Sequence, residues 1–170
     1  MPYFNIVAET SENTVVTEYE PVKKRSDSYQ SEAALEQEFI RLLCEQGYEY
    51  LPIHTEKDLI ANLRKKLEEL NNYQFSDTEW DDFFKNAVAN PNEHIVEKTR
   101  KMQEDNVQVL TRDDGSSKNI TLIDKKNIHN NRLQVINQYV IGTENGAKHD
   151  NRYDVTVLVN GLPLIHIELK

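Results

Sequence analysis

Apolar residues change their spacing near Asp105, and this change limits the possible folds more than any other feature of the sequence. Before Asp105 they recur every three or four residues, which is the period of an amphipathic helix. After it they form short β-branched runs separated by polar or glycine-containing breaks, a pattern typical of strands. Helices followed by a compact set of strands predict an α+β domain, with the helices packed on a mainly antiparallel sheet.

Capping signals suggest where the expected helices begin and end. Ser, Thr or Asn before an apolar-periodic run marks an amino-terminal cap, and proline is favoured in the first turn. We expect helices from Ser31 to the turn before Gly47, over 56–70, from a capping box at Ser76 and Glu79 through Val88, and from Asn90 and Pro91 to about Met102.

The remaining chain divides into an arm and a set of strands. Residues 1–30 are polar and have no clear period, so we interpret them as an amino-terminal arm or linker. Residues 31–170 are long enough for one domain with a hydrophobic core of its own. Within them we expect strands at 107–111, 119–123, 132–141, 153–159 and 162–169.

The net charge of −9 argues against a free-standing nucleic-acid binder, because such proteins attract phosphates with clustered Lys and Arg. It does not exclude a domain whose carboxylates hold cations and that a larger assembly delivers to DNA. We find no signal-peptide pattern, no membrane-spanning segment and no Gly-rich phosphate loop, and expect a cytoplasmic protein. Its single cysteine, Cys44, is expected to be packed.

The last two expected strands carry charged residues within apolar runs. Asp154 lies in the first of them, and Glu168 and Lys170 lie two residues apart, hence on one face, in the second. A strict two-residue turn at Asn160-Gly161 would leave Asp154 and Glu168 on opposite faces. A longer loop or a single bulge would place them opposite each other, and Pro163, which cannot donate to a ladder, is a plausible position for it. We predict that irregularity.

Two converging carboxylates would attract a divalent cation, since at about 4 Å they repel each other by roughly 4 kcal/mol in an effective dielectric near 20. Asp154 and Glu168, with a backbone carbonyl and water, would form the oxygen shell that Mg²⁺ prefers. Lys170 would point at the same site, where it could position or help deprotonate a water and offset phosphate charge. Metal-activated water beside a cationic side chain is suited to phosphodiester hydrolysis.

A solvated charge pair is the simpler interpretation of Glu168 and Lys170. A competing acidic site is Asp124-x-Lys126 with Asp113 or Asp114 upstream, although the polar residues after it are typical of a solvated strand end. In the first helix, Glu36 lies at the border of the apolar stripe and is the better inward-facing acid, whereas Glu38 falls on the wet side. Glu36 is either an edge glutamate or a contact to metal or water.

Aromatic and histidine residues are assigned mainly to packing. His166 shares a strand face with Glu168 and either rims the site or is a packed histidine. None of the five histidines has zinc-ligand spacing, and no nucleophile motif occurs. The residues assigned to the core rather than to base stacking are Tyr48, Tyr50, Trp80, Phe83 and Phe84.

Longer strings of the sequence resemble one protein family. "DSYQSEAALEQEFIRLLCEQGYEY", "ITLIDKKN" and above all "NRYDVTVLVNGLPLIHIELK" are similar to the amino-terminal region of the restriction subunit of type I restriction-modification enzymes, the HsdR family. Asp154 followed by "IELK" resembles the PD-(D/E)XK nuclease motif, with Tyr153 in place of its proline, which such subunits tolerate. The similarity extends from about Asp27 to the last residue.

The resemblance implies a PD-(D/E)XK fold in which Asp154 and Glu168 bind Mg²⁺, Lys170 is the catalytic lysine and Glu36 is a helical acid of the site. It also implies an endonuclease that cleaves DNA after ATP-driven translocation, in complex with methyltransferase and specificity subunits. Family members continue with further nuclease elements, motor domains and a helical domain. We therefore expect residues 31–170 to be part of an endonuclease domain and to be inactive alone.

Two other functions stay open at this point. One is a non-catalytic module whose acidic face docks a protein partner. The other is a PD-(D/E)XK repair nuclease that shares the fold but works without a motor. A reading frame that continues into a motor, beside methyltransferase and specificity genes, would favour the restriction enzyme over both.

Overall fold

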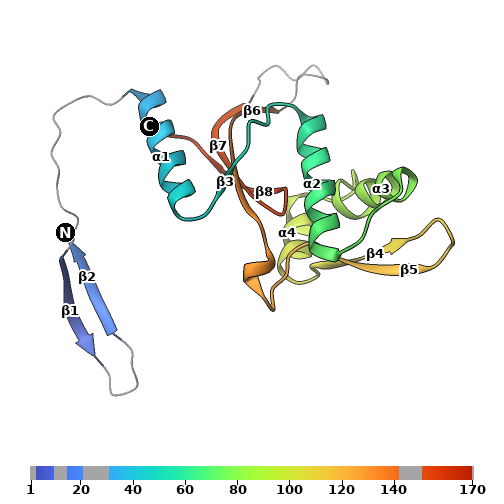
Figure 1. Ribbon diagram of the computed structural model, residues 1–170, viewed down its shortest axis with the longest axis horizontal. Coiled ribbons are helices and arrows are strands. Elements are labelled where there is room, and N and C mark those ends of the chain that lie inside the picture. Colours follow the sequence, from blue (N-terminus) through green and yellow to red (C-terminus); the bar gives the residue numbers. More distant parts are fainter. Residues whose placement is uncertain (1–2, 10–14, 21–30, 142–150, 170) are drawn as a thin grey trace. The chain divides into compact units, whose positions relative to one another are not determined.

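The computed structural model describes residues 3–9, 15–20, 31–141 and 151–169, and the side chains at 31–139 and 153–169 (Figure 1). The chain forms two compact units, Met1–Ser31 and Glu32–Lys170. In the first unit β1 (Tyr3–Glu9) pairs antiparallel with β2 (Val15–Glu20). The polar composition of the expected arm did not predict these strands.

Helices dominate the first half of the second unit. They are α1 (Glu32–Glu45), α2 (Glu56–Asn71), α3 (Asp77–Phe83), the π-helical η1 (Phe84–Val88) and α4 (Ile95–Gln103). Thr55 caps α2 by accepting the Asp58 N–H, and the predicted Ser76–Glu79 capping box is confirmed at α3. Among the described residues, no helix is both long and apolar enough to cross a bilayer.

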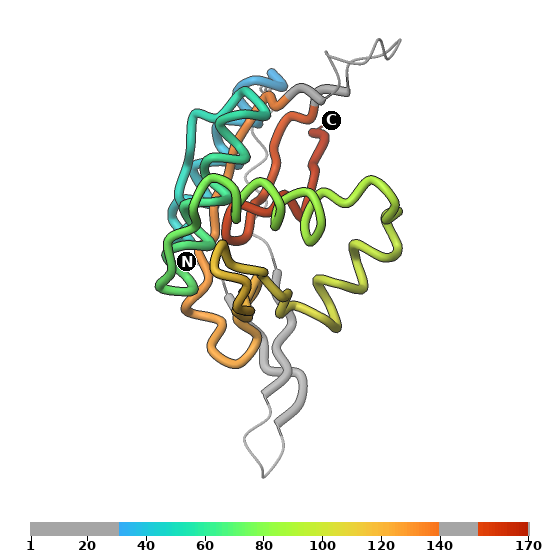
Figure 2. Tube along the Cα trace, turned by 90° about the vertical axis from the view of Figure 1, so that its right-hand side faces the viewer, coloured from blue at the N-terminus to red at the C-terminus, as the bar shows by residue number. Residues whose placement is uncertain are grey.

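The prediction that the last helix begins at Asn90 and Pro91 is wrong. The Asn90 side chain instead accepts the Asn92 N–H at 3.0 Å, which closes a local turn. Helix α4 begins after His94, whose N–H donates to the Glu97 carboxylate at 3.1 Å. None of its side chains is buried, and it projects away from the sheet (Figure 2).

The described strands of the second unit form two separate sheets rather than one compact set. A four-stranded sheet has the order β3 (Glu49–Tyr50), β6 (Leu133–Ile141), β7 (Asn151–Val159) and β8 (Leu162–Ile167). Strand β3 is parallel to β6 and the other pairs are antiparallel, as the expected mainly antiparallel sheet requires. The hairpin of β4 (Val107–Thr111) and β5 (Ser117–Thr121) stands apart, and the short 3-10 helix η2 (Ile128–Asn130) precedes β6.

Helix α2 runs beside the large sheet in both views and contributes to two hydrophobic clusters (Figures 1 and 2). Leu63 and Leu67 belong to one cluster with Trp80 and Phe83 of α3 and with Leu110 and Ile120 of the β4–β5 hairpin. Leu59 packs with Ile136 and other residues of the sheet. This shared helix joins the smaller hairpin to the sheet that carries the candidate site.

The core assignments are partly confirmed. Trp80 and Phe83 are buried, and Phe84 packs against the same cluster. The assignment of Tyr50 is wrong: it is 42% exposed and uses its hydroxyl as a polar contact. Cys44 is also exposed rather than packed, because it lies on a part of α1 that no other described element covers.

The β7–β8 turn is held from several sides. Asn160 and Gly161 have φ angles of 52° and 83°, the left-handed pair that a tight two-residue hairpin turn requires. The buried Asn160 side chain donates to the Leu122 carbonyl at 3.0 Å and accepts the Arg132 N–H at 2.8 Å. A Cβ atom on Gly161 would lie 2.6 Å from Leu63 Cα, so α2 approaches the turn closely. The hairpin is thereby fixed at its turn end.

Candidate active site

The register of β7 and β8 determines on which face of the sheet the two predicted carboxylates lie, and Glu168 directly follows the last residue of β8. Beyond the turn, Leu158 pairs with Pro163, but Val157 pairs with Ile165, so one residue is inserted in β8. The predicted irregularity next to Pro163 is therefore confirmed. Val155 pairs with Ile167, and extending this register by one pair places Asp154 opposite Glu168. Directly opposite residues share a sheet face.

A hydrogen bond supports this arrangement. The N–H of Leu169 donates to Asp154 Oδ2 at 2.8 Å, so the Asp154 carboxylate lies against the main chain immediately after Glu168. Asp154 is half-buried and Glu168 is exposed. The neighbouring residues Val155 and Thr156 are buried, which fixes the strand behind the carboxylate. Lys170 lies outside the described residues.

The oxygen donors at this position fit a hydrated Mg²⁺ ion. Mg²⁺ is usually bound through one or two carboxylates and keeps several waters. In the part of the chain that the structure describes, no group of three or more His, Cys, Asp or Glu residues is arranged to hold a metal. Asp154 and Glu168 could hold such an ion as a pair, with backbone and water oxygens as its remaining ligands.

Glu36 lies on the buried side of α1, as predicted, with only 8% of its surface exposed. Asn137 Nδ2 donates to Glu36 Oε1 at 2.6 Å, and Gln138 Nε2 donates to Glu36 Oε2. Glu38, by contrast, forms an exposed ion pair with Arg41 at 2.7 Å. The prediction that Glu36 faces inward and Glu38 faces solvent is confirmed.

Asn137 and Gln138 are residues that sequence reasoning missed. Their dipeptide interrupts the apolar run "RLQVINQYVI", which is the signal that could have identified them. Successive side chains of a regular strand point to opposite faces. Gln138 has a left-handed φ of 55°, and this local kink allows both carboxamides to reach one carboxylate.

His166 packs against its neighbours at the rim of the site. Its ring stacks on that of Tyr153, with centroids 4.2 Å apart, and its Nδ1 lies 3.0 Å from Thr156 Oγ1. Burial of the ring lowers the pKa of His166. His166 is therefore an exposed residue whose ring is nevertheless held by its neighbours, and the stacking gives Tyr153 a role at the place where the generic motif has proline.

The competing acid, Asp124, is used by its own loop. Its Oδ1 accepts the N–H groups of Asn127 at 2.9 Å and Lys126 at 3.0 Å, and its Oδ2 accepts Asn130 Nδ2 at 2.8 Å. These donors, first the Asn127 N–H, lower the pKa of Asp124. A carboxylate that closes a turn in this way has a structural function, which supports ranking Asp154 and Glu168 above it.

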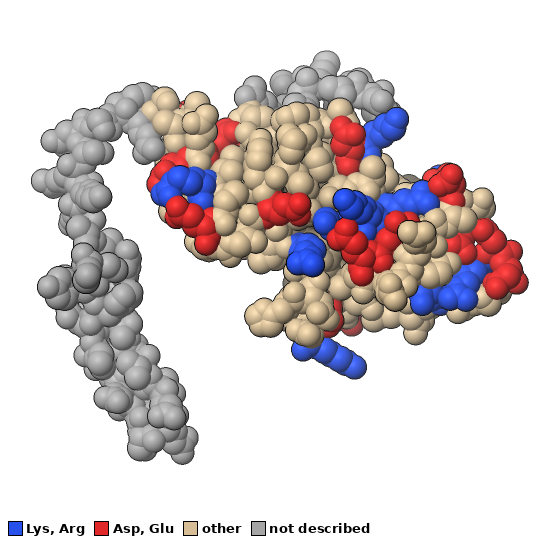
Figure 3. All heavy atoms as spheres, viewed as in Figure 1, with Lys and Arg blue, Asp and Glu red and all other residues tan. Residues whose placement is uncertain are grey.

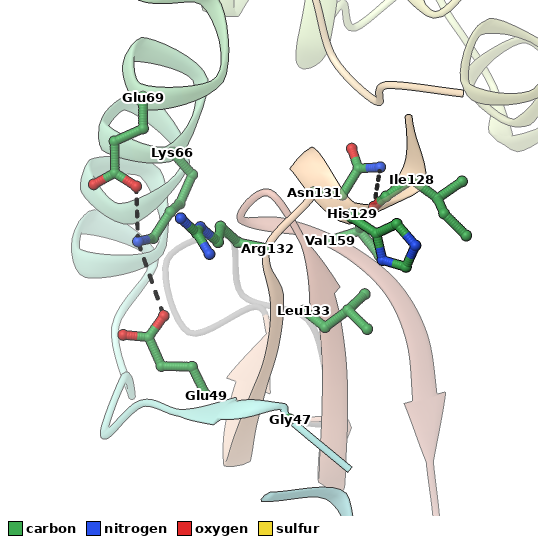
Figure 4. Close-up of a pocket in the computed structure, with 10 residues that line it drawn as sticks. All are labelled: Gly47, Glu49, Lys66, Glu69, Ile128, His129, Asn131, Arg132, Leu133 and Val159. Atoms are coloured by element: carbon green, nitrogen blue, oxygen red, sulfur yellow. Dashed lines mark hydrogen bonds and ion pairs between the residues drawn. The ribbon is translucent and has the colours of Figure 1, made fainter. Parts of the chain in front are cut away.

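A pocket of about 820 Å³ lies at the other end of the sheet (Figure 4). Leu133 and Val159, which pair at the turn end of β6 and β7, line it. Figure 4 shows Lys66 between two acids, at 3.1 Å from Glu69 and 3.8 Å from Glu49. These three charges are paired with one another, and the pocket lies apart from Asp154 and Glu168, which do not line it.

Comparison with known proteins assigns most of the chain to one family. Residues 29–170 match the family described as "Type I restriction enzyme R protein N terminus". The chain is 46% identical over 165 residues to the "Type I restriction enzyme EcoprrI endonuclease subunit" of Escherichia coli, an alignment that covers 96% of this chain and 51% of that protein.

Staphylococcal relatives are more distant and longer. The "Type I restriction enzyme SsaAORF53P endonuclease subunit" of Staphylococcus saprophyticus is 35% identical over 84% of this chain and 15% of its own length. The SauMSSORF170P endonuclease subunit of Staphylococcus aureus is 36% identical, with the same coverage. The chain thus spans about half the length of the first relative and a small part of the others.

Proposed function

This chain belongs to the family of type I restriction enzyme R proteins, as their amino-terminal region, and from that premise we propose that it contributes the first part of a Mg²⁺-dependent endonuclease domain of PD-(D/E)XK type. The observation that carries the proposal is the inserted residue after Pro163, because the resulting register, continued by one pair beyond Val155 and Ile167, would set Asp154 opposite Glu168. Without that insertion, the two acids would lie on opposite faces of the sheet.

In this proposal each residue of the site has a separate task. Asp154 and Glu168 bind the ion, and the Leu169 N–H holds one oxygen of Asp154 so that the other can face it. A bound Mg²⁺ ion would polarise the scissile phosphate and lower the pKa of a bound water. Lys170, two residues after Glu168, would orient that water and offset the phosphate charge. Glu36 would accept a hydrogen bond from the water shell.

DNA, ATP and the partner subunits enter the proposal through the larger enzyme. The net charge of −9, with acidic and basic side chains interspersed on the face in Figure 3, offers no basic stripe there to follow a DNA backbone. We propose that methyltransferase and specificity subunits bring the DNA, and that ATP acts only through motor domains of the complete R protein, in the cytoplasm. That this chain alone does not cut DNA remains a prediction.

The test uses the complete R protein that carries this segment, assembled with its partner subunits. Asp154→Ala, Glu168→Ala and Lys170→Ala should each abolish DNA cleavage and leave the DNA-stimulated ATPase intact. Asp124→Ala is the matched control and should retain cleavage. Full cleavage by the Asp154 and Glu168 variants would refute the proposal, whereas loss of ATPase as well would indicate a folding defect.

Two other functions are less well supported. A protein-docking module would explain the exposed Leu164 and Ile165 on the edge strand β8, which are 43% and 53% exposed. It would not explain the carboxylate register. A repair nuclease would need the same site, but the relatives described above are named as restriction endonuclease subunits. The cleavage and ATPase measurements separate all three functions.

A further inference from the structure

Glu36 is a buried carboxylate that is satisfied by neutral donors. Burying a charge is costly unless hydrogen bonds or an opposite charge compensate. Here the amide groups of Asn137 and Gln138 bond one oxygen each, and Glu36 has no ion pair with Lys or Arg in the described ranges. Both donors are uncharged carboxamides, so they orient the carboxylate without placing an opposite charge beside it.

A third residue fixes the direction of the Asn137 amide. The Tyr50 hydroxyl donates to Asn137 Oδ1 at 2.9 Å. Because this oxygen is occupied as an acceptor, the NH₂ group of Asn137 must point to the other side, where it meets Glu36. Tyr50 itself is held next to β6, since it pairs with Val135 in the parallel ladder. The hydrogen bonds thus run from β3 through β6 to α1.

Gln138 donates to Glu36 and lies on β6 beside the position of Asp154 on β7. Asn137 pairs with Val155, and Tyr139 pairs with Tyr153, so that Gln138 lies in the register position opposite Asp154. That pair is absent from the ladder because Gln138 has the left-handed φ of 55°. A left-handed glutamine is unusual and costs free energy, so its persistence needs a compensating contact. The bond from Gln138 to Glu36 is such a contact.

We propose that Asn137 and Gln138 are positioning residues of the nuclease site, holding the Glu36 carboxylate toward the water shell of the cation bound by Asp154 and Glu168. This inference rests on the proposed function. Lys or Arg in their place would cancel the charge of Glu36, whereas carboxamides orient it and leave its attraction for a hydrated cation intact. We assign Glu36 to the water shell because its donor Gln138 lies in the register position opposite Asp154 on the neighbouring strand.

The test is direct measurement of Mn²⁺ binding to this chain by calorimetry at fixed pH and salt. Asn137→Leu keeps the side-chain size but removes the donor, and should weaken Mn²⁺ binding by about tenfold, the lower end of the range for residues that orient a metal site. In a Glu36→Gln background the same change should have no further effect. Gln37→Leu, an exposed position on the same helix, is the matched control and should bind Mn²⁺ as the parent does.

Further variants separate orientation from folding. Gln138→Gly removes the second donor while tolerating the left-handed backbone, and should weaken binding in the same direction as Asn137→Leu. Tyr50→Phe removes only the orienting hydroxyl and should have a smaller effect. The urea midpoint of each variant shows whether it is folded. The role of Asn137 and Gln138 is then judged from the Mn²⁺ affinities of the folded variants.

The outcomes distinguish this inference from the proposed function. If Asp154→Ala abolishes Mn²⁺ binding but folded Asn137→Leu and Gln138→Gly bind as the parent does, the positioning role is wrong and the nuclease proposal stands. An Asn137→Leu effect that persists undiminished in the Glu36→Gln background would also overturn the positioning role. If Asp154→Ala leaves binding unchanged, the proposed metal site fails and the positioning role fails with it.

Discussion

Replacing Gly161 with alanine tests the contact that fixes the β7–β8 hairpin against α2. The added Cβ atom would lie 2.6 Å from Leu63 Cα and 2.9 Å from Leu63 N, both of which are backbone atoms of a packed helix. Neither atom can move without shifting α2. Gly115 provides the matched control, because its φ of 80° is close to the 83° of Gly161 but its new Cβ would meet nothing within 4 Å.

The two substitutions share one energetic cost and differ in a second. A left-handed backbone costs a residue with a Cβ about 1–2 kcal/mol relative to glycine, and this applies to both positions. Forcing an extra carbon into a packed region costs about 1–3 kcal/mol more, and this applies to Gly161 alone. We therefore expect Gly161→Ala to lower the free energy of unfolding by about 2–5 kcal/mol and Gly115→Ala by about 1–2 kcal/mol.

Urea unfolding followed by circular dichroism measures both variants against the parent. The midpoint should fall in the order parent, Gly115→Ala, Gly161→Ala, while the slope stays constant if the denatured state is unchanged. Equal losses at the two glycines would refute the close approach of α2 to the turn. The structural reason for a fixed hairpin end, and hence for the carboxylate register, would then need another explanation.

Three further predictions concern titration and the competing acid. Because partial burial lowers the pKa of His166, NMR should show its ring titrating below about 6.5. The contribution of the neutral ring to the free energy of unfolding should decline as the pH falls below that value. Titration above about 6.5 would contradict the packing of the ring against Tyr153. The hydrogen bond from Tyr73 lowers the pKa of Glu79, so ionised Glu79 stabilises the fold at pH values above its unfolded pKa, and this stabilisation is lost as the pH falls. Glu79→Gln should therefore reduce the decrease of the urea midpoint on acidification. The same decrease in the parent and the variant would contradict this role. Asp124→Asn should leave the Mn²⁺ affinity unchanged, and a marked loss would reinstate the competing site.

Local signals in the sequence predicted the parts of the fold that depend on neighbouring residues. The Ser76–Glu79 box, the Asn160-Gly161 turn and the irregularity beside Pro163 each follow from the chemistry of a few adjacent residues. Asn90 shows the limit of such signals, because its side chain was equally able to close a turn.

Contacts between distant segments were beyond the reach of the sequence. The expected strands divide into two sheets, both of which pack against α2, and no spacing within a strand could indicate this division. The inward position of Glu36 followed from its place on the helix, but its partner Asn137 is 101 residues away. The sequence did not reveal that Tyr50 is exposed and donates to Asn137, because this hydrogen bond also joins distant segments.

Paramagnetic broadening by Mn²⁺ in the NMR spectrum of this chain tests the central claim most directly. Substoichiometric Mn²⁺ should first broaden the amide signals of Asp154, Glu168 and Leu169, because we place the ion between those two carboxylates. Broadening that centred on Asp124 and its loop, or that left Asp154 and Glu168 sharp while other acids responded, would contradict a shared cation site at the β7–β8 hairpin.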